Sequence, residues 1–156
     1  MLFYILLQQS TNNSFKYKDL ITCMLKVKFN LEEKAFLTSN ECCRIASCYN
    51  NIPHVVPVSY IFEDDVFYFA SDYNTTKYRN IVKNNRVALV IDVYRSIGNK
   101  AVCIQGKSDI IESGEEFSRL YEIFYKRFEW VRMDPWKENE AAFIKVIPTN
   151  KTSWGL

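Results

Sequence analysis

The segment 70–79 combines small, hydroxyl and basic side chains in an order that suits an anion. An apolar run ends at Ser71, and a helix is predicted to begin at Thr75. The first backbone N–H groups of a helix have no partner within it and lie at the positive end of its dipole. With Thr76 and Lys77 at that end, the segment predicts an anion site, and phosphate suits it best.

Two basic residues could supply the charge at this site. Lys77 and Arg79 are two positions apart, so on a helix their side chains point about 200° apart. Both would reach one phosphate only if the helix started late, and Lys77 is therefore ranked above Arg79. The alternative is that both are solvated surface charges.

The elements that must position this segment are mainly strands. Asn30 is predicted to cap a short helix with Glu32 and Glu33 in its first turn. Runs rich in β-branched and aromatic residues follow, separated by turn residues, and they predict a closed or partly closed antiparallel barrel. These runs are "RIASCY", "HVVPVSYIF", "DVFYFAS", "RVALVIDVY" and "KAVCIQGKSDII", with "AAFIKVIPT" as a last strand.

A second helix is predicted after the fifth run, in "SGEEFSRLYEIFYKRFEW". Ser113 and Glu116 have the spacing of a capping box. Aromatic and leucine side chains recur at helical spacing and form one broad apolar face. That face is expected to pack on the barrel or on another subunit.

Length and composition favour one domain spanning residues 1–156, with residues 1–28 as an N-terminal extension of open role. Met24 could be a second start site or a buried side chain. The formal net charge is +2, with basic residues scattered among acidic ones, which argues against a nucleic-acid partner. The opening "MLFYILLQQS" is too short for a signal peptide core or a membrane span, so a soluble, cytoplasmic chain is expected.

The chain has five cysteines and one histidine, His54. An odd cysteine count without paired CxxC elements predicts neither a disulfide framework nor a zinc site, and a single histidine argues against His-based metal sites and catalytic triads. His54 is expected on a strand as an ordinary polar residue. Four of the cysteines are interpreted as small core residues in strands: Cys42, Cys43, Cys48 and Cys103.

The stretch "RIASCYNNIPHVVPVSYIFEDDVFYFASDYNTTKYRNIVKNNRVALVIDV", residues 44–93, resembles the core of the pyridoxamine 5'-phosphate oxidase-like, FMN-binding split-barrel family. The resemblance rests on an ordered set: P-x-V-x-P-V-x-Y, a strand ending in small or hydroxyl residues, then K-x-R-N and N-x-R-V-A-L. It implies a mainly β fold with helices (α+β), a split antiparallel barrel of about six strands.

The resemblance implies that the anion is the 5'-phosphate of FMN. The family's phosphate-binding Arg-Lys pair falls on Thr76-Lys77, so the lysine is kept and a hydroxyl replaces the arginine. Thr75 and Thr76 could donate O–H bonds, and Arg79 could act as a second cation. The flavin ring is expected along Pro57, Val58, Ser59 and Tyr60, and the ribityl chain beside Ala70 and Ser71.

The family also implies a homodimer. Trp154 stands six residues after Pro148, the offset at which the family places a tryptophan that reaches the partner's flavin. It could instead pack on its own barrel. Gln105 is a weaker match to a flavin-contacting glutamine that the family has four residues earlier, where this chain has Ala101. A proline within a strand cannot donate to the ladder, so Pro57 predicts an edge strand or a bulge where the ligand enters.

Oxidases of the family continue into an R-x-H-x-R tail that grips the substrate phosphate, and the printed sequence shows none. No useful turnover of pyridoxine or pyridoxamine 5'-phosphate is therefore expected. FMN carries the redox chemistry, so no catalytic side chain is assigned. The expected function is an FMN-dependent oxidoreductase with an unidentified small electron donor or acceptor. The alternatives are a non-catalytic flavin-binding or electron-carrier protein and a deazaflavin-dependent reductase.

Overall fold

The structure, a computed structural model, describes residues 27–156, so both alternatives for Met24 lie outside the described part. Within it, the strands are β1 (Cys42–Tyr49), β2 (Ile52–Ser59), β3 (Ile61–Glu63), β4 (Val66–Ser71), β5 (Arg86–Val93), β6 (Lys100–Ile111) and β7 (Ala142–Trp154). The helices are α3 (Leu31–Ser39), α4 (Thr76–Lys83), α5 (Gly114–Arg127) and α6 (Glu129–Met133).

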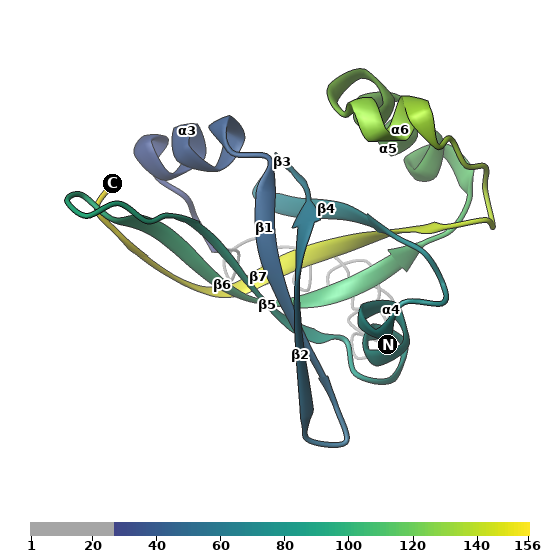
Figure 1. Cartoon of the computed structure of the whole chain (residues 1–156), viewed down its shortest axis with the longest axis horizontal. Coiled ribbons are helices and arrows are strands. Elements are labelled where there is room, and N and C mark those ends of the chain that lie inside the picture. Colours follow the sequence, from purple (N-terminus) through teal and green to yellow (C-terminus); the bar gives the residue numbers. More distant parts are fainter. Residues whose placement is uncertain (1–26) are drawn as a thin grey trace, which may run out of the picture.

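The strands form one antiparallel sheet in the order β2-β1-β5-β6-β7-β4-β3. The sheet curls until β2 contacts β4, although no ladder joins them (Figure 1). This is a split β-barrel of the mainly β, α+β kind that the sequence predicts. Because β2 is an edge strand, the prediction of an edge position for Pro57 is confirmed.

The sheet has seven strands rather than about six. The run "HVVPVSYIF" was expected as one strand, but it divides at Tyr60 into β2 and β3. β2 pairs with β1 and β3 pairs with β4, so the chain crosses the split of the barrel at this residue. Tyr60 is fully buried there, and its N–H donates to the carbonyl of Glu41 at 3.0 Å.

The last strand is also longer than expected, since it continues from Thr149 to Trp154. Beyond a bulge at Gln105 and Gly106, the residues of this extension pair with the first half of β6, with Trp154 opposite Ala101. A Cβ at Gly106 would lie 2.9 Å from the carbonyl oxygen of Ile147, so the close approach of the strands requires glycine here.

Alternate side chains of the strands fill the interior of the barrel. Ile45, Leu89, Ile104, Phe69 and Ile144 come from five different strands and are all at most 2% exposed. Successive side chains of each strand thus alternate between the interior and the exterior of the barrel.

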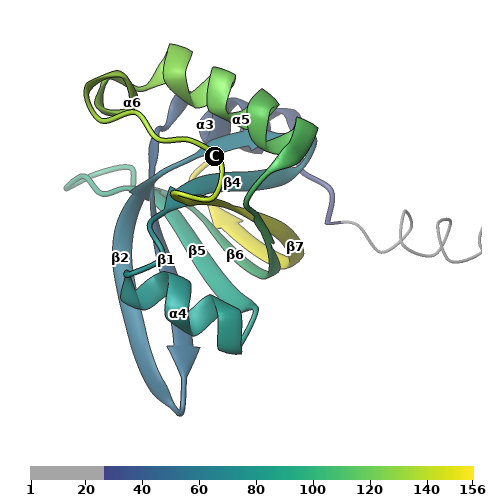
Figure 2. The same ribbon diagram turned by 90° about the vertical axis from the view of Figure 1, so that its right-hand side faces the viewer.

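α5 covers one half of the barrel's exterior. Its Phe117, Leu120 and Phe124 pack against Tyr68 of β4 and Phe143 of β7. In Figure 2 this helix lies across the top of the sheet, while α4 lies at the opposite end. Of the two positions expected for the aromatic face of α5, on the barrel or on another subunit, the structure shows the first.

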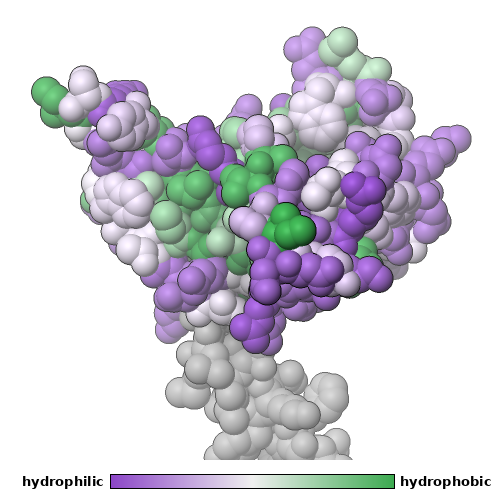
Figure 3. All heavy atoms as spheres, turned by 60° about the horizontal axis from the view of Figure 1, so that its bottom comes forward, coloured by the Kyte–Doolittle hydropathy of each residue, from purple (hydrophilic) through white to green (hydrophobic). Residues whose placement is uncertain are grey.

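The other half of the exterior is not covered by any described helix. We call it the outer face; it is lined by Arg44, Ala46, Val55, Ala88, Val90, Cys103, Gln105, Asn150 and Thr152, which come from β1, β2, β5, β6 and β7. Val55 is 59% exposed although it is apolar. Figure 3 views this side from below and shows apolar residues gathered among polar ones.

α3 begins as the sequence predicts, but its first turn also contains a buried ion pair. The Asn30 side chain accepts the Glu33 N–H, and the Glu33 carboxylate accepts the Asn30 N–H, both at 2.8 Å. The same carboxylate is 2% exposed, pairs with Lys151 of β7 and accepts the Ser153 hydroxyl at 2.7 Å. These contacts hold α3 against the C-terminal part of β7.

Two sequence predictions about smaller features are wrong. Ser113 makes no side-chain cap bond, and the Glu116 carboxylate, which a capping box would direct to the Ser113 N–H, instead accepts a hydrogen bond from Lys145 at 2.8 Å. The four described cysteines do lie in strands, but only Cys43 is buried. The others belong to alternate positions that point away from the interior. His54 lies half-buried on β2, as expected.

Replacing Glu33 with Gln is expected to lower the free energy of unfolding at pH 7 by about 1.5–3 kcal/mol, because Lys151 loses a charged hydrogen-bond partner. Burial alone would raise the pKa of Glu33, but its bonds from Lys151, Ser153 and the Asn30 N–H outweigh burial, and the pKa is lowered. The stabilisation is therefore complete above the ordinary carboxyl pKa of about 4.3 and is lost as pH falls through the lowered value.

Urea unfolding at pH 7 and at successively lower pH measures this difference. Glu32→Gln, in the same turn but exposed, is the matched control and should leave stability nearly unchanged. A loss for Glu33→Gln that persists undiminished at the lowest pH would contradict the assignment.

Candidate functional site

The site predicted from segment 70–79 is a corner between the end of β4 and the start of α4. Thr75 is the N-cap of α4: its hydroxyl oxygen accepts the Tyr78 N–H at 3.4 Å. The same hydroxyl donates to the carbonyl of Asp72 at 2.8 Å and lies 3.0 Å from the hydroxyl of Ser71. These bonds close the corner, and they occupy the Thr75 hydroxyl proton that was considered as a phosphate donor.

α4 is held on the sheet by its opposite face. Ile81 is 2% exposed in the barrel core. The Asn80 amide donates to the Ser47 hydroxyl at 3.2 Å, and the Asn84 amide donates to the carbonyl of Cys48 at 2.9 Å. Both partners belong to β1, so the helix start is fixed relative to the sheet.

The first amides of α4 remain available. Thr75 caps Tyr78, and the Arg79 N–H bonds to the carbonyl of Thr75 at 3.1 Å. The N–H groups of Thr76 and Lys77 have no acceptor among residues 27–156. They lie at the positive end of the helix dipole, where an anion is stabilised.

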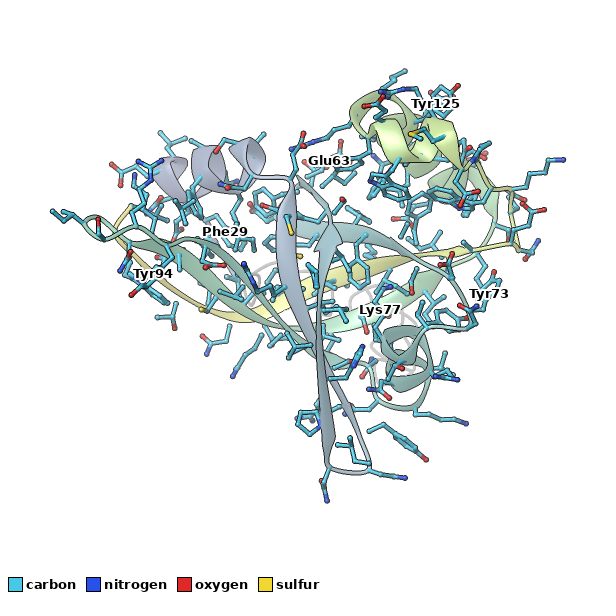
Figure 4. The ribbon with its side chains drawn as sticks, in the orientation of Figure 1. Phe29, Glu63, Tyr73, Lys77, Tyr94 and Tyr125 are labelled. Carbon is cyan, nitrogen blue, oxygen red and sulfur yellow. The ribbon has the colours of Figure 1, made fainter. Side chains whose placement is uncertain are left out.

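Lys77 is half-buried at this helix start, and Figure 4 shows it between α4 and the sheet. Burial lowers the pKa of its ammonium group, and the nearby Asp72 carboxylate opposes that shift only in part. Lys77 forms no salt bridge with any residue of the described part. A partly desolvated cation without a paired carboxylate favours an anion in contact with it.

Lys77 opens onto a cleft of about 250 Å³, whose lining residues are Ala70, Ser71, Asp72, Lys77, Trp130, Asp134, Trp136 and Ala141. Three of the predicted site residues therefore meet here: Ala70, Ser71 and Lys77. The two tryptophans, from α6 and the segment after it, were not predicted. In the sequence, only the aromatic content of "EWVRMDPW" could have indicated a binding role. The contact of its tryptophans with the corner joins segments that are far apart in the sequence.

Arg79 does not line this cleft. It is exposed, and its guanidinium donates to the Thr76 hydroxyl oxygen at 3.4 Å. The two cations thus lie on different sides of the helix start, as their spacing in the sequence suggests. Thr76 is exposed beside Arg79.

The predicted ring-binding residues 57–60 lie at the edge of the sheet. Pro57 is exposed, Val58 and Ser59 are half-buried at the end of β2, and Tyr60 is fully buried. The Tyr60 hydroxyl donates to the carbonyl of Leu37 at 2.6 Å, and the backbone N–H of Tyr60 is bonded as well. The backbone of β2 therefore presents a free strand edge, whereas the Tyr60 side chain is buried in the core.

Gln105 and Trp154 lie apart from the corner. Gln105 is exposed and lines the outer face, and Trp154 is 49% exposed beside Arg44 and Tyr94. Neither residue lines the corner cleft. A single chain therefore does not bring all the predicted site residues together.

Lys151 is not free to bind a substrate phosphate. It is the basic residue closest to the expected position of the family's tail, but its ammonium pairs with Glu33 and lies 5.0 Å from the centre of the Phe29 ring. Both contacts hold β7 against α3.

Residues 29–152 match the family model described as pyridoxamine 5'-phosphate oxidase. The match covers most of the chain, and the chain belongs to this family. No protein with a curated description matches it. Within residues 27–156, no helix is long and apolar enough to cross a membrane.

Solved structures share the fold. A Listeria innocua protein provisionally named a pyridoxamine 5'-phosphate oxidase aligns with a TM-score of 0.66 at 21% identity, over 81% of this chain and 100% of its own. A Mesorhizobium loti FAD-binding protein gives 0.64 at 21% identity, over 80% and 94%. HutZ, the heme storage protein of Vibrio cholerae, gives 0.69 at 12% identity, over 81% and 94%. At such identities the likeness extends to the fold alone.

Proposed function

We propose that this chain is an FMN-binding oxidoreductase that exchanges electrons with a small-molecule donor or acceptor. The observation that carries the proposal is Lys77, a half-buried cation without a salt bridge in the described part, placed at a capped helix start in a cleft. Membership of the pyridoxamine 5'-phosphate oxidase family supports flavin as the ligand.

The donors at the corner fit the phosphate of a flavin nucleotide. The ammonium of Lys77, the N–H groups of Thr76 and Lys77, and the Thr76 hydroxyl can all donate to phosphate oxygens. Asp72 and Asp134 line the same cleft and oppose an anion, but both are exposed, so water and salt screen their charges.

The remaining residues would orient the rest of the ligand. Ala70 and Ser71 let the ribityl chain approach β4 closely, and the backbone of Pro57, Val58 and Ser59 would meet the polar edge of the ring along the free edge of β2. FMN itself supplies the electron-transfer chemistry when bound, whereas the chain supplies position and excludes water.

We further propose that the site is completed in a homodimer. The corner cleft of about 250 Å³ is smaller than the roughly 300–1,000 Å³ of ordinary ligand pockets. Gln105 and Trp154 lie away from it in the same chain. The apolar outer face is the surface on which a second copy would pack, and that copy's Gln105 and Trp154 would then approach the flavin.

Lys77→Ala is expected to weaken FMN binding by about 1.5–3 kcal/mol, roughly 10- to 150-fold, through lost charge-assisted hydrogen bonds. Quenching of flavin fluorescence on titration measures the dissociation constant. Lys83→Ala, at the exposed end of the same helix, is the matched control and should bind FMN as the parent does. Equal affinity of the Lys77 variant and the control would remove Lys77 from the site.

The flavin-loaded protein is expected to reduce an added acceptor over many turnovers with NADH or NADPH as the donor. Flavin absorbance and acceptor reduction are followed together, with free FMN at the same concentration as the control. Rates no faster than those of free FMN, with every donor and acceptor tested, would instead support a flavin carrier without catalysis.

The chain is expected to sediment as a dimer at micromolar concentration. Val55→Glu should convert it to a monomer, because the variant places a charge on an exposed apolar position of the outer face. Val82→Glu is the matched control: Val82 is 51% exposed, comparable to Val55 at 59%, but belongs to α4. A parent chain that is monomeric with full flavin occupancy would overturn the two-chain site.

A further inference from the structure

Two basic residues stand opposite each other on neighbouring strands at the exterior of the barrel. Arg86 begins β5, Lys107 lies in β6, and the two are direct partners in the β5–β6 ladder. Both side chains are exposed, while Val87 and Ser108, the next residue along each strand, are buried. Like charges directly opposite each other destabilise an antiparallel pair. Natural proteins break local rules of this kind at functional sites.

The charges of this pair are not neutralised by the described residues. Neither cation forms a salt bridge within residues 27–156, whereas Arg44, elsewhere on the same side of the sheet, pairs with Asp92. The next carboxylate along β6 is Asp109, and its partner in the ladder is Lys145 of β7. The pair therefore places two positive charges side by side without an acidic residue bonded to either.

The pair lines a cleft of about 530 Å³ that adjoins the outer face. Ala46, Ala88 and Gln105 line both surfaces, and they are successive partners across β1, β5 and β6. Among residues 27–156, those that line the cleft include no carboxylate. Its volume lies within the roughly 300–1,000 Å³ of ordinary ligand pockets. The corner cleft at Lys77 shares no residue with it.

The backbone that carries the two cations is fixed by bonds outside the ladder. The Arg86 N–H donates to the side-chain oxygen of Asn84 at 3.2 Å, and the Asn84 amide donates to the carbonyl of Cys48. In β6, the N–H and the hydroxyl of Ser108 both donate to the carbonyl of Asn85, at 2.8 and 3.0 Å. A ligand bound between the cations would therefore order little of the backbone.

The two side chains offer complementary donors. A guanidinium presents a planar fork of N–H groups that suits an oxyanion, and an ammonium adds a point charge on a flexible stem. Together they carry a charge of +2. A phosphate monoester carries between about −1.5 and −2 at neutral pH, so one such group balances the pair, whereas an anion of charge −1 leaves one cation unpaired.

We propose that Arg86 and Lys107 form a second anion site, separate from the corner at Lys77, which binds phosphate as a free ion or as the terminal group of a small organic molecule. The short side chains of Ala46 and Ala88 leave space beside the cations for an organic part. The site needs no flavin, so it goes beyond the proposed function.

Two-dimensional NMR titrations of the full-length chain test the proposal through the amide signals of Arg86, Ala88 and Lys107. Sodium phosphate, sulfate and acetate are added separately, while sodium chloride holds the ionic strength constant. Phosphate and sulfate are expected to shift these signals along saturating curves. Acetate should bind about fivefold more weakly, because it pairs with one cation only. Phenyl phosphate identifies the source: tighter binding than phosphate assigns an organic ligand, and equal binding assigns the free ion.

Arg86→Gln and Lys107→Gln should each lower the affinity for phosphate about fivefold, because each variant loses one ion pair. Lys100→Gln is the matched control: Lys100 is exposed on β6, but its partner in the ladder is Val93. This control should bind phosphate as the parent does. Lys77→Ala, which removes the cation of the corner, should leave the shifts at Arg86 and Lys107 unchanged.

Thermal unfolding in dilute buffer gives a second measurement. Removal of one of two opposite like charges should leave the unfolding temperature of each glutamine variant at or above that of the parent. A lower temperature for both variants would show that the cations have stabilising partners, and would overturn the proposal.

Three NMR outcomes would also overturn the second site. Equal shifts with acetate and phosphate indicate general screening of charge. Phosphate shifts that survive both glutamine substitutions place the anion elsewhere. Shifts confined to the start of α4, and lost in Lys77→Ala, place the anion at the corner alone and leave the proposed function in place.

Discussion

In this protein a single curled sheet encloses the core, although its two ends do not pair with each other to close the barrel. Side chains from β1, β4, β5, β6 and β7 meet in the interior, while β2 and β4 come into contact without pairing. A barrel that closes removes every strand edge, whereas a split one leaves an edge and a gap beside it. The free edge of β2 and the corner after β4 both lie at this split.

The rest of the molecule determines which surfaces stay open. α5 covers the exterior of β4 and β7 with Phe117, Leu120 and Phe124, and the ion pair of Glu33 and Lys151 holds α3 against the end of β7. The outer face is left uncovered by the described residues. The same arrangement that stabilises the barrel therefore leaves the surface on which we propose that a second chain packs.

The chemistry of the corner follows from local bonds within a rigid frame. The hydroxyls of Thr75 and Ser71 lie within hydrogen-bond distance of each other, and both donate to the carbonyl of Asp72. The helix start is therefore formed before any ligand binds. Asn80 and Asn84 fix that helix on β1. Lys77 is desolvated by this packing, and a phosphate would restore the interactions that its ammonium group loses from water.

Much of the fold could be predicted because it depends on local pattern. Runs of β-branched and aromatic residues separated by turn residues predicted the strands, and the Asn30 cap is a signal of four consecutive residues. The contacts that were missed depend on residues far apart in the sequence. These are the crossing at Tyr60, the Glu33–Lys151 pair and the use of Glu116 by Lys145 rather than by the Ser113 cap.

The site shows the same division. The helix start at Thr75 could be predicted from nearby residues, whereas Trp130 and Trp136 meet Ala70 and Ser71 in the cleft only through contacts between segments far apart in the sequence. The flavin-binding roles of residues 57–60 and of Gln105 and Trp154 come from family resemblance, and they stay predictions.

The amide signals of Thr76 and Lys77 in a two-dimensional NMR spectrum test the central claim most directly. We expect both signals to shift on addition of FMN and to shift much less with riboflavin, which has the same ring and no phosphate. Equal shifts with the two ligands, or shifts confined to residues distant from the start of α4, would contradict a phosphate site at this corner.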